Sequence, residues 1–152
     1  MQPKSAAILP PAQTAPPGSS SSILALRVYY EDTDAAGVVY YANYLRFCER
    51  ARTEWLRELG IGQQSLMASD GIAFVVRSVK ADYLRAARLD DALEVITRIS
   101  ALRGASLLFE QDVQREGQLL FSAQVLVACI DQRRQKPTPI PTQLYSLFES
   151  LA

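Results

Sequence analysis

The sequence has 152 residues, 49% of them hydrophobic, and it carries 16 basic and 16 acidic side chains, so its formal net charge is zero. This length and composition suit one globular domain, and a neutral chain lacks the basic surface typical of nucleic-acid binding. The chain has no histidine, which excludes Ser-His-Asp and Cys-His triads and histidine-based zinc sites. We therefore predict no nucleic-acid partner and no metal.

The N-terminal segment, residues 1–22, is rich in proline, serine and alanine, and its short apolar run is broken by Pro10 and Pro11. We predict a disordered tail over residues 1–22, without the features of a signal peptide, followed by one domain over residues 23–152. No later stretch is long and apolar enough for a membrane span. Cys48 and Cys129 lack CxxC spacing, which indicates buried, reduced thiols and favours a cytoplasmic location.

Along the chain, apolar and polar residues first alternate over residues 24–30, which predicts a strand with one buried face. Residues 42–59 then show an apolar stripe at three- and four-residue intervals, typical of an amphipathic helix that Gly60 ends. Residues 63–69 are compatible with a further short helical turn. The stripe of the long helix consists of Leu45, Cys48, Ala51, Arg52, Trp55, Leu56 and Leu59.

Strand patterns dominate the rest of the chain, over residues 72–84, 93–102, 107–113 and 119–130. Glu116-Gly117 is typical of a tight hairpin turn, and the proline-broken end of the chain is expected to finish in a short helix. Strands joined by short turns form an antiparallel sheet, so we predict an α+β fold with the helix packed across that sheet. Because one helix rarely covers a whole sheet, a second copy of the chain is expected to complete the packing.

Three carboxylates, Glu31, Asp32 and Asp34, lie between the first strand and the long helix. The first N–H groups of a helix have no partner within it and carry the positive end of its dipole, so they can stabilise negative charge on a substrate oxygen. A nearby carboxylate can then act as base or nucleophile. Helix capping alone would also explain an acidic residue here, but three exceed the need of one cap, and small residues follow at positions 35–37.

The run RVYYEDTDAAGVVYYANYLRFCERARTEWLRELG resembles the acyl-CoA thioesterases of the 4-hydroxybenzoyl-CoA thioesterase family, in their YbgC-like branch, which is associated with the Tol–Pal gene cluster. The segments AFVVRSVKADYLRAARLDDALEVITRISALRGASLLF and AQVLVACIDQRRQKPTPIP carry the same resemblance, which covers roughly residues 24–142. It implies a hot-dog fold, in which a five-stranded antiparallel sheet wraps a long central helix. It also implies active sites at a dimer interface, and homodimers that assemble into homotetramers.

By this resemblance Asp34 matches the catalytic carboxylate of the family, and the backbone N–H of Tyr41 matches the donor to the thioester carbonyl oxygen. Arg103 and Ser106 fall where family members contact the CoA portion of the substrate. YbgC-like members usually carry histidine where this chain has Tyr41, whereas other members of the wider family have an aromatic residue. We therefore expect the backbone N–H, and not the side chain, to be the required group.

Further substrate contacts are predicted near the helix start. Asn43 and Tyr44 are candidates for the substrate pocket, although structural hydrogen bonds are an equal alternative there. Glu49 corresponds to an acidic position that lines the acyl pocket in some family members; the alternative is a solvated helix charge. Three more basic residues are candidates for the CoA phosphates or are simply solvated: Arg77, Lys80 and Arg85.

These observations together predict hydrolysis of an acyl-CoA thioester, with an acyl carrier protein conjugate as an alternative substrate. No cofactor is expected, since CoA is part of the substrate. The leading rival is a catalytically weak module that binds acyl-CoA or an acyl carrier. A dehydratase is disfavoured because such enzymes pair a carboxylate with histidine. Peripheral association with a membrane complex is a further expectation, without direct support from the residues.

Overall fold

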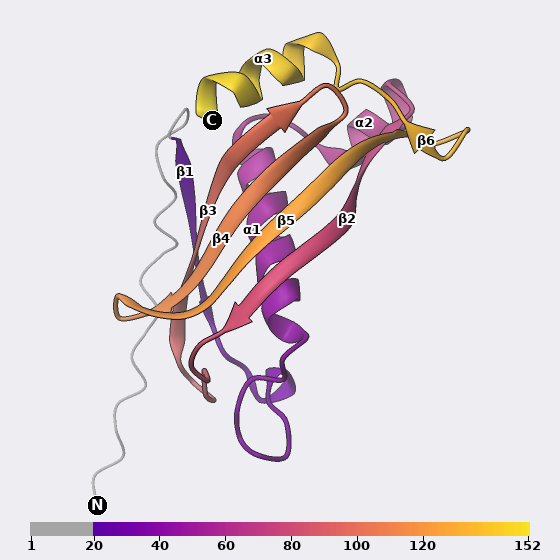
Figure 1. Ribbon diagram of the computed structural model, residues 1–152. Coiled ribbons are helices and arrows are strands. Elements are labelled where there is room, and N and C mark those ends of the chain that lie inside the picture. The colour runs from indigo at the N-terminus through magenta and orange to yellow at the C-terminus, as the bar shows by residue number, and fades with distance from the viewer. Residues whose placement is uncertain (1–19) are drawn as a thin grey trace, which may run out of the picture.

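The computed structural model describes residues 20–152, in which one long helix is cradled by a curled antiparallel sheet (Figure 1). The elements in chain order are β1 (Ser21–Arg27), the one-turn helix η1 (Tyr30–Asp32), α1 (Asn43–Glu58), α2 (Gln63–Ser69), β2 (Ile72–Tyr83), β3 (Ala92–Arg103), β4 (Ser106–Arg115), β5 (Gln118–Asp131), β6 (Lys136–Pro137) and α3 (Thr142–Leu151). The predicted long helix, the short helix after it and the C-terminal helix are all confirmed.

The sheet runs in the order β1-β3-β4-β5-β2, and every pair in it is antiparallel. Helix α1 lies across one face of this sheet (Figure 1). The predicted α+β arrangement with five long strands is thus confirmed. A sixth strand of two residues, β6, pairs with β5. It was not predicted, because it is very short and lies in a proline-rich segment.

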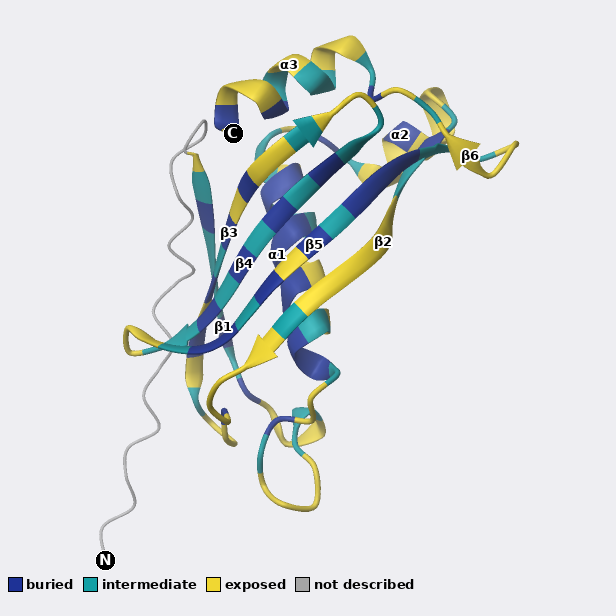
Figure 2. Ribbon diagram, in the orientation of Figure 1, coloured by how far each residue is buried: buried dark blue, intermediate teal, exposed yellow. Residues whose placement is uncertain are grey.

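The core forms where the apolar stripe of α1 meets the inner face of the sheet, drawn dark blue in Figure 2. Cys48 and Trp55 on α1 are almost fully buried, as are Val95, Phe109 and Val125 on three different strands. Burying a side chain of this size contributes roughly 1.5–3 kcal/mol. The helix therefore owes its position to burial, as its periodicity predicted.

Two boundaries follow from local backbone chemistry. The β4–β5 hairpin turns at Glu116 and Gly117, whose φ angles are +51° and +77°; this left-handed region suits a tight hairpin turn and confirms the predicted one. Strand β1 begins at Ser21 and buries Ser22, so the domain starts two residues before the predicted boundary at residue 23. Residues 1–19 of the predicted tail lie outside the described residues.

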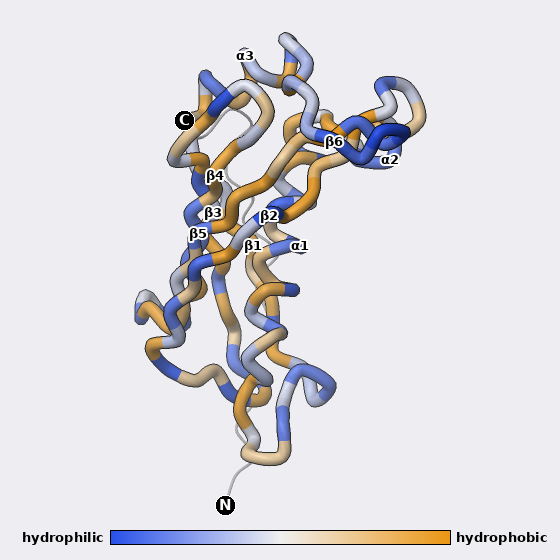
Figure 3. Tube along the Cα trace, turned by 45° about the vertical axis from the view of Figure 1, so that its right-hand side comes forward, coloured by the Kyte–Doolittle hydropathy of each residue, from blue (hydrophilic) through white to orange (hydrophobic). Residues whose placement is uncertain are grey.

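Strand β2 leaves one long edge of the sheet open. It pairs with β5, and no strand of residues 20–152 pairs with its other edge. Val75, Val76 and Val79 on this strand are 39–48% exposed, and Figure 3 shows hydrophobic stretches in β2 that resemble those of the interior strand β5. An open apolar edge is what pairing with a second copy requires, and that pairing stays a prediction.

Within residues 20–152, no helix is both long enough and apolar enough to cross a membrane.

Candidate active site

The acidic segment forms a narrow loop just before α1. The Tyr40 N–H donates to the Asp32 carbonyl at 2.9 Å, and the Asp34 N–H donates to the Val38 carbonyl at 2.9 Å. The Gly37 N–H closes the tip by donating to the Asp34 carbonyl at 3.0 Å, and its φ of +77° favours glycine there. These bonds place Asp34 at the tip of the loop.

The carboxylate of Asp34 is exposed, and its Oδ1 accepts the Ala36 N–H at 2.9 Å. This bond orients the side chain. The remaining lone pairs of the carboxylate stay available to accept further hydrogen bonds or a proton. Neither of the two cavities described below includes Asp34. Within a single chain, the predicted catalytic carboxylate therefore faces open space.

Tyr41 lies in the turn that leads into α1. Its N–H has no acceptor among residues 20–152, as expected for an amide at a helix start. Its carbonyl accepts the hydroxyl of Tyr83, from the end of β2, at 3.0 Å. Burial raises the pKa of Tyr83, so this hydroxyl stays protonated and remains a donor at neutral pH. The structure thus offers a free amide next to a carbonyl that is held in place.

Aromatic rings form a wall beside this amide. The ring of Tyr83 lies 6.2 Å from that of Tyr41, 5.6 Å from that of Tyr44 and 5.0 Å from that of Phe121, centroid to centroid. The rings of Tyr44 and Phe121 stack at 5.0 Å. Tyr44 and Phe121 are buried, whereas Tyr41 and Tyr83 are exposed, so the wall presents an apolar surface to solvent beside the amide.

The other polar residues of this region hold the loop in place. Asp32 Oδ2 accepts the Tyr29 N–H at 2.8 Å, so Asp32 caps the short helix η1 and not α1. Asn43 Nδ2 donates to the Asp32 carbonyl at 2.9 Å. The hydroxyl of Tyr44 accepts the Ala87 N–H at 2.9 Å, and burial raises its pKa. The structural alternative weighed for Asn43 and Tyr44 is therefore realised, and contact with a substrate stays a prediction.

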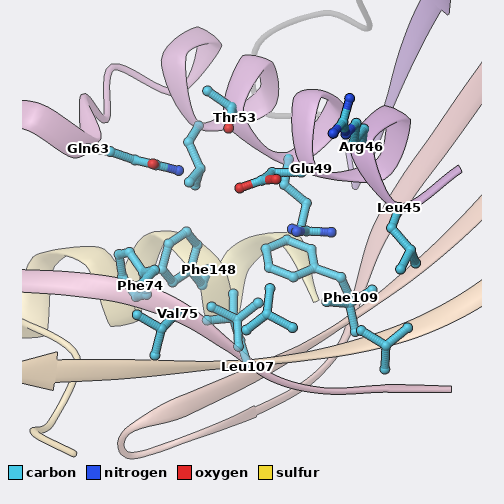
Figure 4. A pocket seen from close by; sticks show the side chains of 16 residues that line it. Leu45, Arg46, Glu49, Thr53, Gln63, Phe74, Val75, Leu107, Phe109 and Phe148 are labelled. Atoms are coloured by element: carbon cyan, nitrogen blue, oxygen red, sulfur yellow. The ribbon is translucent and has the colours of Figure 1, made fainter. Parts of the chain in front are cut away.

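A cavity of about 500 Å³ lies between α1 and the sheet, called here the inner cavity. It begins at Leu45, one helical turn beyond Tyr41, and its lining includes Phe74 on β2 and Phe148 on α3. Figure 4 shows Glu49, Phe109 and Phe148 facing this space. Glu49 therefore borders this cavity while remaining exposed, and a contact with an acyl group stays a prediction.

A second cavity of about 440 Å³, the outer cavity, is lined by residues of β2, β3, β4 and β5, among them the exposed residues Arg77, Lys80 and Arg103. Arg103 and Ser106 are direct partners across the β3–β4 turn and both border it. Arg77 and Lys80 of β2 border it too. The predicted CoA contacts thus lie beside two of the three other basic candidates; Arg85 does not border this cavity.

Two charged residues that line the inner cavity, Arg46 and Arg52, were not predicted as functional candidates, and of these only Arg52 is buried. Arg52 is only 8% exposed, and its Nη1 donates to Gln111 Oε1 at 2.7 Å. Gln111 Nε2 in turn donates to the Cys48 carbonyl and to Thr97 Oγ1, both at 2.9 Å. Burial lowers the pKa of Arg52 and raises that of Cys48 to about 12. The available signal was a cation inside the apolar stripe of the helix.

A long helix cradled by a curled antiparallel sheet is the architecture of the hot-dog fold. The chain belongs to the thioesterase-like superfamily, which it matches over residues 28–148. It is 50% identical over 126 residues to the acyl-CoA thioesterase YbgC of Haemophilus influenzae, across 83% of this chain and 93% of that protein. The acyl-CoA thioester hydrolase YbgC of Escherichia coli O6:H1 is 51% identical over 82% of this chain and 92% of its own.

Solved structures agree with this assignment. A probable thioesterase from Bartonella henselae superposes with a TM-score of 0.76 at 39% identity, over 80% of this chain and 99% of that one. A 1,4-dihydroxy-2-naphthoyl-CoA thioesterase from Synechocystis superposes with a TM-score of 0.79 at 25% identity, over 84% and 95% of the two chains. The predicted hot-dog fold and the resemblance to the YbgC-like branch are confirmed.

Proposed function

We propose that this chain hydrolyses acyl-CoA thioesters to a free carboxylic acid and CoA, with Asp34 as base or nucleophile. The observation that carries this proposal is the unpaired Tyr41 amide at the start of α1, on the same loop-to-helix junction as Asp34. Support comes from the relatives named acyl-CoA thioesterase YbgC at 50% identity. An acyl carrier protein conjugate is an alternative thioester donor.

In the proposed reaction, the thioester carbonyl oxygen accepts the Tyr41 N–H. Negative charge that develops on this oxygen is stabilised by the amide and by the positive end of the α1 dipole. Asp34 then takes a proton from an attacking water molecule. Alternatively it attacks the carbonyl carbon itself, which gives a mixed anhydride that water hydrolyses. In both routes the C–S bond breaks, and the CoA thiolate leaves and takes up a proton.

The two cavities suit the two ends of such a substrate. The outer cavity offers Arg77, Lys80 and Arg103 to phosphates, with Ser106 as a hydrogen-bonding neighbour. The inner cavity offers an apolar lining to the acyl group. The exposure of Asp34 and the open β2 edge support a site that a second copy completes, in the homodimer and homotetramer that the resemblance implies.

The proposal is tested with Asp34→Asn, which keeps the shape of the side chain and removes its basicity. We expect kcat for thiol release to fall at least about 100-fold, in the range of a lost general base, while the melting temperature stays close to that of the wild type. Asp70→Asn is the matched control, since Asp70 is exposed at the end of α2. Substrates should span short, long and aromatic acyl-CoAs. Wild-type turnover by Asp34→Asn on all of them would refute the assignment.

The second candidate is a module that binds acyl-CoA without efficient turnover. The position of Asp34 outside both cavities of the single chain favours it. Such a module would raise its melting temperature with acyl-CoA and release no thiol. A thermal shift combined with a thiol assay on the same samples separates the two functions.

A further inference from the structure

Arg52 is a buried cation that forms no salt bridge within residues 20–152, although the negative charge of Glu49, on the wall of the same cavity, acts on it. It is 8% exposed, and its guanidinium makes one hydrogen bond, to the neutral side chain of Gln111. Among residues 20–152, no carboxylate lies within ion-pair distance of it. A guanidinium carries several N–H donors, so most of those of Arg52 have no acceptor within the described chain.

These unpaired donors are open to the inner cavity. Within residues 20–152, no side-chain nitrogen or oxygen is both sealed off and without a partner, and Arg52 borders the inner cavity. The guanidinium is held in place because Gln111, itself 0% exposed, is bound to the Cys48 carbonyl and to Thr97. The cavity therefore contains a positioned donor and not a mobile surface charge.

The surroundings of the guanidinium make its donors selective. Phe109, Val125 and Leu56 line the same cavity, and a plain alkyl chain packed against them would leave the N–H groups of Arg52 without an acceptor. Leaving buried donors unpaired costs free energy, whereas an oxygen on the ligand would form charge-assisted hydrogen bonds with them. A site built in this way discriminates strongly against an analogue that lacks the oxygen.

The donor lies within reach of an acyl chain that starts at the candidate active site. Gln111 contacts both the guanidinium and the Cys48 carbonyl, which places the guanidinium near the level of Cys48 on α1. Cys48 follows Tyr41 by seven residues, or about 10 Å along a helix axis. An acyl group whose carbonyl oxygen binds the Tyr41 N–H would therefore pass Arg52 part of the way along its length.

We propose that Arg52 makes the inner cavity selective for acyl groups that carry a hydrogen-bond-accepting oxygen, a hydroxyl or a carboxylate, over unsubstituted alkyl groups of the same length. This inference rests on the proposed function in taking an acyl thioester as the ligand. It goes beyond that function by naming the substrate class and the residue that selects it.

The test measures binding without catalysis. S-alkyl-CoA thioethers lack the reacting carbonyl, so their affinity does not depend on the role of Asp34. Hexyl, octyl and decyl thioethers are compared by isothermal titration with the same chains carrying a terminal hydroxyl or a terminal carboxylate. The proteins are the wild type, Arg52→Met and the control Arg50→Met, which removes an exposed cation from the same helix.

For the wild type, at one chain length or more, we expect an oxygen-bearing thioether to bind at least about tenfold more tightly than the plain one. Arg52→Met should lose this preference, and Arg50→Met should keep it. A wild type that prefers the plain chain at every length overturns the inference, as does an unchanged preference in Arg52→Met. If the preference holds while Asp34→Asn keeps its turnover, the substrate class stands and the proposed catalytic role fails.

A second variant covers the case in which Arg52→Met does not fold. Gln111→Glu has nearly the same shape and supplies the guanidinium with a carboxylate from within the chain. We expect the preference for an oxygen-bearing thioether to drop about tenfold, because the carboxylate neutralises the charge of the guanidinium. An unchanged preference in a folded Gln111→Glu protein overturns the inference.

Discussion

The inner and outer cavities are both lined by arginine, but Arg52 of the inner cavity is buried and the arginines of the outer cavity are exposed to solvent. Arg52 in the inner cavity is 8% exposed and has a neutral partner, so its interactions act in a medium of low dielectric constant. Arg77 and Arg103 at the outer cavity are exposed, where solvent and salt screen their charge. A buried cation can discriminate between ligands that differ by one oxygen, whereas exposed cations mainly attract anionic groups.

The largest expected effect comes from removing the partner of the buried cation. Gln111→Leu removes the side-chain hydrogen bonds that Gln111 makes with Arg52, Thr97 and the Cys48 carbonyl, and we expect it to lower the free energy of unfolding by about 3 kcal/mol. Urea denaturation measures this. The double variant Arg52→Met/Gln111→Leu removes the charge as well and should recover part of the loss. A single variant as stable as the wild type would contradict the importance of this buried network.

The next largest effect is a loss of folding stability at alkaline pH, which arises from the buried thiol of Cys48 on α1. Burial raises the pKa of Cys48 from 9.0 to about 12, so in the folded state the thiol keeps its proton where the unfolded chain loses it. Stability is complete below the unfolded pKa and falls as pH rises towards the folded one; the Cys48 contribution to this loss is about 1.4 kcal/mol by about pH 10.

Urea denaturation of the wild type and Cys48→Ala at about pH 8 and about pH 10 isolates that contribution, since the remaining titrating groups are common to both proteins. We expect the wild type to lose more stability than the variant over this interval. Equal losses in the two proteins would show that the thiol is not held in its neutral form.

A smaller effect is expected at the outer cavity. Arg103→Ala should raise KM for acyl-CoA about fivefold at low salt and change kcat little, because an exposed cation contributes mainly attraction to phosphate. The increase should shrink as salt is added. Arg57→Ala is the control, since Arg57 is an exposed arginine of α1 paired with Glu54. A KM effect that persists at high salt would contradict this expectation, since it would show that the charge of Arg103 is desolvated in the complex, as that of Arg52 is.

The smallest effect is expected where β2 meets the helix start. Tyr83→Phe removes the hydrogen bond to the Tyr41 carbonyl and keeps the aromatic wall. We expect kcat to fall about threefold with KM nearly constant, as for the loss of one neutral hydrogen bond that orients the site. Tyr30→Phe, at an 83% exposed position, serves as the control. An unchanged kcat would show that the amide needs no such support.

Sequence reasoning predicted the helix start of the candidate site but not its outer cavity. The free amide before α1 and the position of Glu49 on the helix followed from local patterns and from the family motif. The second cavity was not predictable, because Arg77 and Arg103 lie on strands that meet only through β4 and β5. Asp32 caps η1 and not the long helix, because a capping residue indicates a helix end without saying which helix.

The sequence by itself determined the helix over residues 43–58 and the strands that cover it, because hydrophobic periodicity is a local property that the chain carries in any fold. It also determined which residues belong to the thioesterase motif. Only the tertiary structure decided that Arg52 lies 2.7 Å from Gln111, a residue 59 positions away, and that Asp34 lies outside both cavities. Such contacts depend on strand order and register, which bring together residues that no local pattern connects.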